Sequence, residues 1–148
     1  FMVLSNLLKY NIEYDRIAKQ TYLNKSIEEL RITGKAINEL TIDDDVAYAI
    51  IDKKENAYKN INYNTFSKKI LTSLNNIDNI NIIVGMLVDD EKVEIIIRSH
   101  TIIIEPILKK FGGGGHKYAA GATIYNKNVN TIISDIQNEI LKLKSTSK

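Results

Sequence analysis

Four consecutive glycines, Gly112 to Gly115, are followed directly by His116 and Lys117. Glycine has no Cβ, so such a run can adopt positive φ and let a ligand approach its backbone N–H groups. Bare amides beside an imidazole and an ammonium group are the components of an anion-binding loop. The small residues Ala119, Ala120 and Gly121 come soon after and would let a second surface come close to the backbone. We therefore expect this loop to hold a negatively charged ligand.

A helix end is the alternative explanation for these glycines. Helices often stop at a glycine, and one glycine after Phe111 would need no ligand. Such a stop uses a single glycine, however, and four in succession cost more conformational entropy than it requires. The residues alone therefore favour ligand binding.

Arg98 and Ser99 end a predicted strand shortly before the loop. An arginine at a strand end offers a planar fork of donors that suits a phosphate or the edge of a base. A solvated surface charge explains Arg98 equally well when it is taken alone. His100 is interpreted as a surface residue, whereas His116 is expected to contact the ligand because of the glycines beside it.

Known phosphate-binding and catalytic patterns do not fit the chain. A Walker loop needs Gly-Lys-Ser/Thr, but Gly115 is followed by His116, and the dinucleotide pattern needs a third glycine where Tyr118 stands. The acidic residues fall in predicted turns, and the two histidines lack partners at metal-ligand spacing. No Ser-His-Asp arrangement can be built either. The residues predict a binding module with no metal centre.

The composition fits one compact domain, or one domain with an attached arm: 148 residues, no cysteine and a net charge of +2. The absence of cysteine excludes disulfides and thiolate metal sites. No apolar run approaches the ~20 residues that span a membrane, so we expect a cytoplasmic protein with no membrane partner. Residues 98–148 hold 8 Lys+Arg against 3 Asp+Glu, whereas the remaining residues hold 12 against 15. The positive charge thus lies on the side of the glycine loop.

Hydrophobic periodicity predicts an α+β fold with mixed α/β layers, in which a mixed sheet of about four to five strands is flanked by helices. A helical connector precedes the sheet: a capping box from Ser26 to Glu29 starts a helix that ends near Leu40. The polar stretch from Thr41 to Asp45 is interpreted as a break. Strands are predicted at 46–52, 80–88, 93–98 and 122–125. Helices are predicted at 2–9, 12–22 and 105–111, after a cap at Thr65, and from Val129 onward.

The segment RSHTIIIEPILKKFGGGGHKYAAGA, residues 98–122, closely resembles the C-terminal, DHH-associated domain of DHH-family phosphoesterases. The nearest look-alikes are bacterial oligoribonucleases that also dephosphorylate adenosine 3′,5′-bisphosphate (pAp). The resemblance implies three parts: residues 1–24 as the tail of an N-terminal DHH catalytic domain, residues 25–45 as the connector, and residues 46–148 as the substrate-binding domain.

In this family the N-terminal domain carries the aspartates and histidines that hold manganese. The resemblance therefore implies Mn²⁺ in that domain, and no catalytic or metal-binding residue in this chain. It makes this chain the lobe that grips a short RNA or a nucleotide while its own N-terminal DHH domain hydrolyses the phosphate ester. The expected substrate-binding residues are Arg98, Ser99, Gly112, Gly113, Gly114, Gly115, His116, Lys117 and Gly121. One departure is Ile103, where relatives commonly place an aspartate; its absence removes a cap and leaves the start of the following helix unexplained.

Two other functions fit the same residues. One is the corresponding lobe of a cyclic-dinucleotide phosphodiesterase, and the other is a stand-alone nucleic-acid-binding module, which predicts salt-dependent binding of single strands. Few aromatic residues lie near the loop (Phe111 and Tyr118), which disfavours stacking along a strand. The similar domain of alanyl-tRNA synthetases fits the connector helix less well. A homodimer is the one further assembly that we include among the expected partners.

Overall fold

The computed structural model describes residues 2–10, 12–22, 25–55, 58–75 and 77–146. The chain divides into two compact units, residues 1–30 and residues 31–148. The first unit is helical, and the second contains the whole sheet. None of the helices in these ranges is both long enough and apolar enough to cross a membrane.

The first unit contains α1 (Met2–Leu8), α2 (Tyr14–Tyr22) and the start of α3 (Ile27–Asn38). The predicted capping box is present: the Glu29 N–H donates to the Ser26 hydroxyl at 3.1 Å, and the Ser26 N–H donates to the Glu29 carboxylate at 3.4 Å. These findings confirm the short helices and the start of the connector helix. Residues 1, 11, 23 and 24 of the predicted tail lie outside the described residues.

Six strands form one sheet in the order β1-β2-β3-β4-β6-β5. β2 and β3 pair in parallel, and all other neighbours pair antiparallel. The strands are β1 (Thr41–Asp43), β2 (Val46–Asp52), β3 (Ile82–Val88), β4 (Lys92–Ser99), β5 (Gly114–His116) and β6 (Ala119–Tyr125). This mixed sheet confirms the predicted fold class.

The sheet has more strands than the four to five predicted, because two short edge strands were missed. β1 occupies most of the expected polar break, and β5 is formed by the glycine run. Each has only three residues, all of them exposed. β1 has two β-branched residues but is too short to show an alternating pattern, and the Gly-Gly-His sequence of β5 has neither feature.

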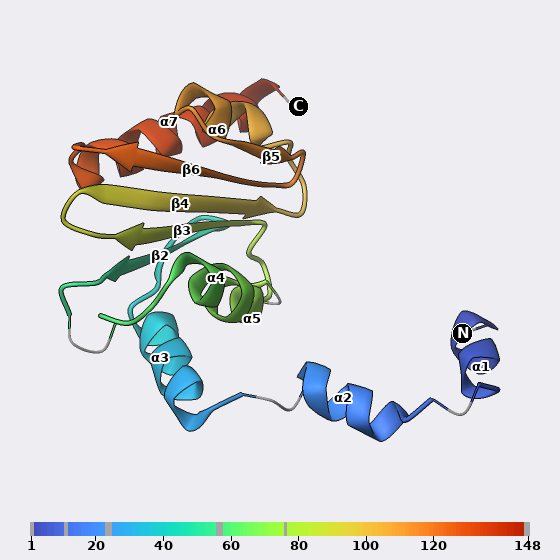
Figure 1. Ribbon diagram of the computed structural model, residues 1–148. Coiled ribbons are helices and arrows are strands. Elements are labelled where there is room, and N and C mark those ends of the chain that lie inside the picture. The colour runs from blue at the N-terminus through green and yellow to red at the C-terminus, as the bar shows by residue number, and fades with distance from the viewer. Residues whose placement is uncertain (1, 11, 23–24, 56–57, 76, 147–148) are drawn as a thin grey trace. The chain divides into compact units, whose positions relative to one another are not determined.

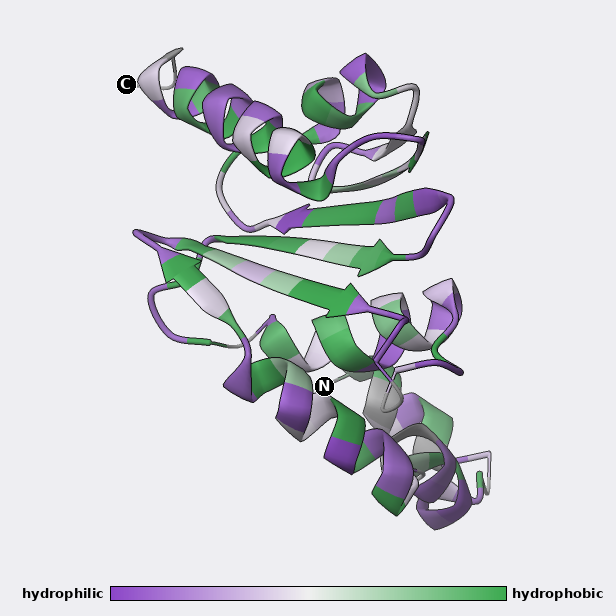
Figure 2. Cartoon of the chain, turned by 90° about the vertical axis from the view of Figure 1, so that its left-hand side faces the viewer, coloured by the Kyte–Doolittle hydropathy of each residue, from purple (hydrophilic) through white to green (hydrophobic). Residues whose placement is uncertain are grey.

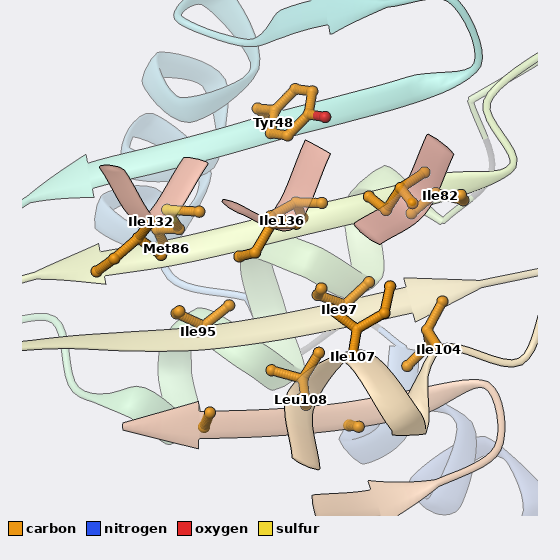
Figure 3. Packing of buried hydrophobic residues seen from close by; sticks show 14 of the residues in the cluster. Tyr48, Ile82, Met86, Ile95, Ile97, Ile104, Ile107, Leu108, Ile132 and Ile136 are labelled. Atoms are coloured by element: carbon orange, nitrogen blue, oxygen red, sulfur yellow. The ribbon is translucent and has the colours of Figure 1, made fainter. Parts of the chain in front are cut away.

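Helices cover both faces of the sheet. One face packs against α6 (Glu105–Lys110) and α7 (Val129–Thr146). Figure 1 shows these two helices lying together, and Figure 3 shows Leu108 and Ile136 pointing into the same cluster of sheet side chains. The other face packs against α3 and against a helical stretch formed by α4 (Tyr63–Thr65), η1 (Phe66–Ile70) and α5 (Leu71–Leu74). β3 and the middle of β4 (residues 95–97) are therefore buried on both faces, and Figure 2 shows both stretches mostly in the hydrophobic colour.

The helical stretch between β2 and β3 includes a π-helical turn, η1. Asn62 caps its start by accepting a hydrogen bond from the Thr65 N–H at 2.9 Å, so the predicted cap at Thr65 is wrong by three residues. Gly85 of β3 lets this stretch approach the sheet closely. A Cβ at Gly85 would lie 2.6 Å from a methyl group of Leu71 and 2.9 Å from the Phe66 ring.

The short helix α6 begins without a side-chain cap, as the isoleucine at position 103 led us to expect. The backbone carbonyl of Lys117 takes the place of a cap. It accepts the N–H of Ile104 at 2.8 Å and the N–H of Glu105 at 3.4 Å. Pro106 lies in the first turn, where a missing N–H costs nothing. The start of α6 is thus fixed by the turn that follows the glycine run.

Candidate functional site

The glycine run begins as a helix C-cap. The Gly112 N–H donates to the Lys109 carbonyl at 3.0 Å, and the Gly113 N–H donates to the Leu108 carbonyl at 2.9 Å. With Gly112 at φ +74°, these two bonds form a Schellman motif. The expectation that all four amides are bare is therefore wrong for Gly112 and Gly113, whose amides are used by their own helix. A helix stop accounts for half of the run.

The second half of the run is the edge strand β5. Gly114 pairs with Gly121 and Gly115 pairs with Ala120 on β6, and no other described strand lies beyond β5. One row of backbone N–H and C=O groups on an edge strand has no strand partner. Gly114 and Gly115 are both exposed. The bare backbone that the sequence predicts is therefore found at the outer edge of β5.

Close packing explains why side chains are missing at some of these positions. A Cβ at Gly113 would lie 2.2 Å from the Gly121 carbonyl oxygen, and a Cβ at Gly115 would lie 2.5 Å from the Ala119 carbonyl oxygen. Gly114 is different, because a Cβ there would meet nothing within 4 Å. The fold itself therefore requires Gly113 and Gly115, whereas Gly114 leaves open space above the sheet.

Three residues align in one row across β4, β6 and β5. Arg98 pairs with Ala119, and Ala119 pairs with His116. Side chains of directly paired residues point to the same face, so Arg98 and His116 face one another across Ala119, with their backbones about 9–10 Å apart. Ala119 contributes only a methyl group. The next row consists of Ile96, Gly121 and Gly114, and the side chain of Ile96 in it is buried. Two basic side chains thus border a floor of nearly bare backbone.

Arg98 is held in place by the helical stretch over this face. Its Nη2 donates to the Ser67 carbonyl at 2.8 Å, and its Nη1 donates to the Thr72 hydroxyl at 3.2 Å. Burial lowers the pKa of the guanidinium from its ordinary value, and the nearby Tyr63 opposes this shift. An arginine has five N–H donors, so two bonds orient the side chain and leave donors for a ligand.

An open pocket of about 550 Å³ adjoins the same floor. Its lining includes Tyr63, Glu94, Gly114, Gly121 and Thr123. The Tyr63 hydroxyl lies over Gly121, where a Cβ would be only 2.8 Å from it. Burial raises the pKa of Tyr63, the charge of Glu94 adds to this, and Arg98 opposes it. Tyr63 and Glu94 therefore line one cavity whose lining also includes four glycines, at positions 112, 113, 114 and 121.

A family model described as the DHHA1 domain matches residues 43–142. The chain belongs to the DHHA1 domain family. The family resemblance drawn from the glycine run and the strand before it is thereby confirmed.

The chain is 24% identical to the bifunctional oligoribonuclease and PAP phosphatase NrnA of Bacillus subtilis strain 168. The alignment spans 132 residues and covers 88% of this chain and 42% of NrnA. An exopolyphosphatase-related protein from Bacteroides fragilis matches with a TM-score of 0.79 and 23% identity, over 97% of this chain and 44% of that one. The pGpG-specific phosphodiesterase PggH of Vibrio cholerae matches with a TM-score of 0.56 and 13% identity, over 78% of this chain and 40% of that one. The two structural matches show a shared fold. The chain spans less than half the length of each of these relatives.

The DHHA1 domain brings some of the predicted site residues together and separates others. Arg98, Gly114, His116 and Gly121 share one face of the sheet. Ser99 points to the opposite face and is buried, and its hydroxyl accepts the N–H groups of Thr101 at 3.2 Å and Ile102 at 3.0 Å. The visible role of Ser99 is therefore to shape the turn after β4.

Among the remaining predicted residues, some lie at the site and others have a visible structural role. The side chain of Lys117 is exposed, and its carbonyl accepts the first amides of α6. Gly112 and Gly113 line the pocket although their amides are engaged, so they offer shape and not donors. Gly115 lies on the edge strand next to His116. Whether these residues contact substrate stays a prediction.

Sequence reasoning missed four residues of this face: Tyr63, Ser67, Thr72 and Glu94. Glu94 could have been predicted from the sequence, because it lies four positions before Arg98 on the same strand and alternation places both side chains on one face. Tyr63 was hidden by the misplaced cap, since a helix starting after Asn62 would have put it in an exposed first turn. Ser67 and Thr72 carry no signal, because their contact with Arg98 spans 31 and 26 positions.

Across the described ranges, no group of three or more His, Cys, Asp or Glu side chains is arranged to hold a metal ion. Glu94 lines the pocket and is paired with Lys92 at 2.9 Å. These side chains do not fit a metal centre, so no reaction step is assigned to a metal on this domain.

Proposed function

We propose that this DHHA1 domain is the substrate-binding lobe of a DHH-family phosphoesterase that acts on short RNA or on nucleotides such as pAp. The observation that carries the proposal is the row formed by Arg98, Ala119 and His116. It places two basic side chains on either side of one methyl group and next to the exposed backbone of β5, which suits a phosphate group approached by backbone and guanidinium donors. Similarity to NrnA supports the choice of short RNA and pAp as substrates.

In this proposal the lobe binds and orients the substrate and performs no bond-making step. Arg98 donates to phosphate oxygens, and its bonds to Ser67 and Thr72 fix the direction of the guanidinium. His116 and the outer edge of β5 lie on the other side of the phosphate. The hydrolytic machinery, including the expected Mn²⁺, belongs to residues outside this chain. Such positioning lowers the barrier by holding the reacting phosphate in place.

The test uses the complete protein with Arg98→Ala and His116→Ala variants, assayed on pAp and on di- to pentaribonucleotides. Loss of a phosphate contact of about 1–3 kcal/mol lowers kcat/KM by about 5- to 150-fold. Lys54→Ala is the control, because it removes an exposed positive charge that is paired with Asp90 and does not line the pocket. Unchanged kcat/KM in both site variants would contradict the proposal.

Substrate class is decided in the same assays. Equal turnover of a cyclic dinucleotide and pAp would widen the proposal to cyclic dinucleotides. Salt-dependent binding of long single strands without hydrolysis would favour a nucleic-acid-binding module instead.

A further inference from the structure

A carboxylate lies at one end of a face whose other end is basic. Glu94 and Arg98 are on the same strand and the same face, four residues apart, which separates their backbones by about 13 Å. The side chain of Glu94 is 17% exposed and lines the pocket. A carboxylate repels a phosphate, so the phosphate and Glu94 must contact different parts of one ligand. The pocket therefore suits a ligand with an anionic end and a donor-bearing end.

Glu94 has acceptor capacity left for such a ligand. One of its oxygens accepts a hydrogen bond from the Lys92 ammonium at 2.9 Å, and within the described residues the other oxygen accepts none. A carboxylate has about four lone-pair positions in all. Removing this partly buried charge from water is costly unless hydrogen-bond donors replace the water. A ligand with two adjacent N–H donors would supply them.

Tyr63 provides a flat surface beside Glu94. The Tyr63 side chain is 39% exposed, and its hydroxyl lies over Gly121. Gly114, where a Cβ would meet nothing within 4 Å, leaves open space in the same pocket. An aromatic ring beside an open, glycine-based cavity is the arrangement on which nucleobases stack.

We infer that Tyr63 and Glu94 form a nucleobase subsite that prefers guanine, next to the phosphate site at Arg98 and His116. The inference rests on the proposed function, since it assigns the base of the same nucleotide whose phosphate Arg98 holds. Guanine presents its ring N1–H and its exocyclic amino group side by side, so both can donate to one carboxylate. Adenine has an acceptor nitrogen next to its amino group, which faces the carboxylate unfavourably. Hypoxanthine keeps the N1–H but lacks the amino group.

The experiment measures binding of GMP, IMP and AMP to the complete protein by calorimetry, without added metal. A matched bidentate contact discriminates by about 5- to 100-fold, so the wild-type protein should bind GMP that much more tightly than AMP, with IMP between them. In Glu94→Gln the preference should fall to about twofold or less, while AMP affinity changes little. Tyr63→Ala should weaken all three nucleotides together, because stacking does not depend on the base.

Two controls separate the carboxylate from its surroundings. Glu91→Gln removes an acidic side chain on the β3–β4 turn, outside the pocket lining, and should leave the preference intact. Lys92→Gln removes the ion pair and keeps the Glu94 carboxylate, so the preference should persist. Equal loss in Lys92→Gln and Glu94→Gln would overturn the inference, as would a guanine preference that survives Glu94→Gln.

The outcomes also distinguish this inference from the proposed function. Tight binding of all three nucleotides that depends on Arg98 but shows no base preference would overturn the guanine subsite and leave the phosphate site standing. Absence of binding by any nucleotide, with no effect of Arg98→Ala on kcat/KM, would overturn both.

Discussion

The Nη2 of Arg98 donates to the carbonyl of Ser67 at 2.8 Å, and Ser67 lies in the π-helical turn η1. π-turns are rare in proteins, but those that occur lie frequently at functional sites. Their wider hydrogen-bond ring presents backbone groups that an α-helix would pair internally. Here the turn presents a carbonyl to the side chain that we assign to phosphate binding. The orientation of Arg98 is therefore set by a helix 31 positions earlier in the chain, and not by the glycine run.

Thr72→Val tests this positioning role in the complete protein. The variant loses the hydroxyl that accepts from the Arg98 Nη1 at 3.2 Å but keeps the shape of the side chain. We expect KM for pAp to rise by about 2- to 10-fold with kcat little changed, because one hydrogen bond to a charged group is lost while the chemistry is untouched. Ser73→Ala is the control, since that hydroxyl bonds only within its own helix, to the Lys69 carbonyl. Identical changes in the two variants would argue against positioning.

Gly85→Ala tests the close approach of the helical stretch to β3. The added methyl would lie 2.6 and 2.7 Å from the two terminal carbons of Leu71, so the helix must shift outward. Overpacking of this kind destabilises by about 1–3 kcal/mol, which urea unfolding would measure. Gly34→Ala in α3 is the matched control, because a Cβ there meets nothing within 4 Å and alanine favours a helix by about 1 kcal/mol. Gly85→Ala without loss of stability would show that the core is looser than the distances indicate.

Gly113→Ala and Gly114→Ala separate folding from binding within the glycine run. A Cβ at Gly113 would collide with the Gly121 carbonyl, so we expect a loss of about 1–3 kcal/mol or more in stability. Gly114→Ala should change stability by no more than about 0.5 kcal/mol, because the new methyl enters open space. That space is part of the proposed site, so nucleotide binding by Gly114→Ala should weaken. Normal binding by a stable Gly114→Ala protein would remove Gly114 from the site.

The ion pair between Asp45 and Lys144 predicts a pH dependence of stability. Burial acts to raise the pKa of Asp45, but hydrogen bonds from Lys144 and Asn81 outweigh it and hold the pKa below its ordinary value of 3.8. A depressed pKa contributes stability above pH 3.8 that is lost as the pH falls through the folded-state value. Lys144→Met should therefore cost up to about 1 kcal/mol at pH 7 and progressively less below pH 3.8. Urea unfolding of both proteins from pH 7 to pH 2 measures the difference, and a constant gap would contradict it.

Sequence patterns predicted the parts of this fold that depend on local chemistry and long apolar runs. Local sequence patterns were enough to predict the capping box at Ser26, the buried strand β3 and the amphipathic helix α7. The edge strands β1 and β5 do not, because three residues pair only when a neighbouring strand is present to pair with. The dependence on a neighbouring strand also explains why the part of the site on β5 was not predicted as a strand.

The site itself was predicted at one end and missed at the other. Arg98 and His116 stand out in the sequence because of the glycines near them, and the register places both on one face. Ser99 stands next to Arg98 in the chain but points to the opposite face, since neighbours on a strand alternate. Glu94 and Tyr63 join the site only through strand alternation and through helix packing. Adjacency along a strand is thus a poor guide to shared function, whereas a spacing of two or four is a good one.

Hydrogen bonds connect both ends of α6 to the β5–β6 hairpin. The carbonyl of Lys117 accepts hydrogen bonds from the first amides of α6, and the last carbonyls of α6 accept hydrogen bonds from the amides that lead into β5. The helix cannot open without freeing the hairpin turn, and the hairpin cannot open without fraying the helix. We therefore expect the amides of Ile104, Glu105, Gly112 and Gly113 to exchange with deuterium at one common rate, as a single cooperative unit. A ligand bound at the hairpin would then slow exchange at the far end of α6 as well.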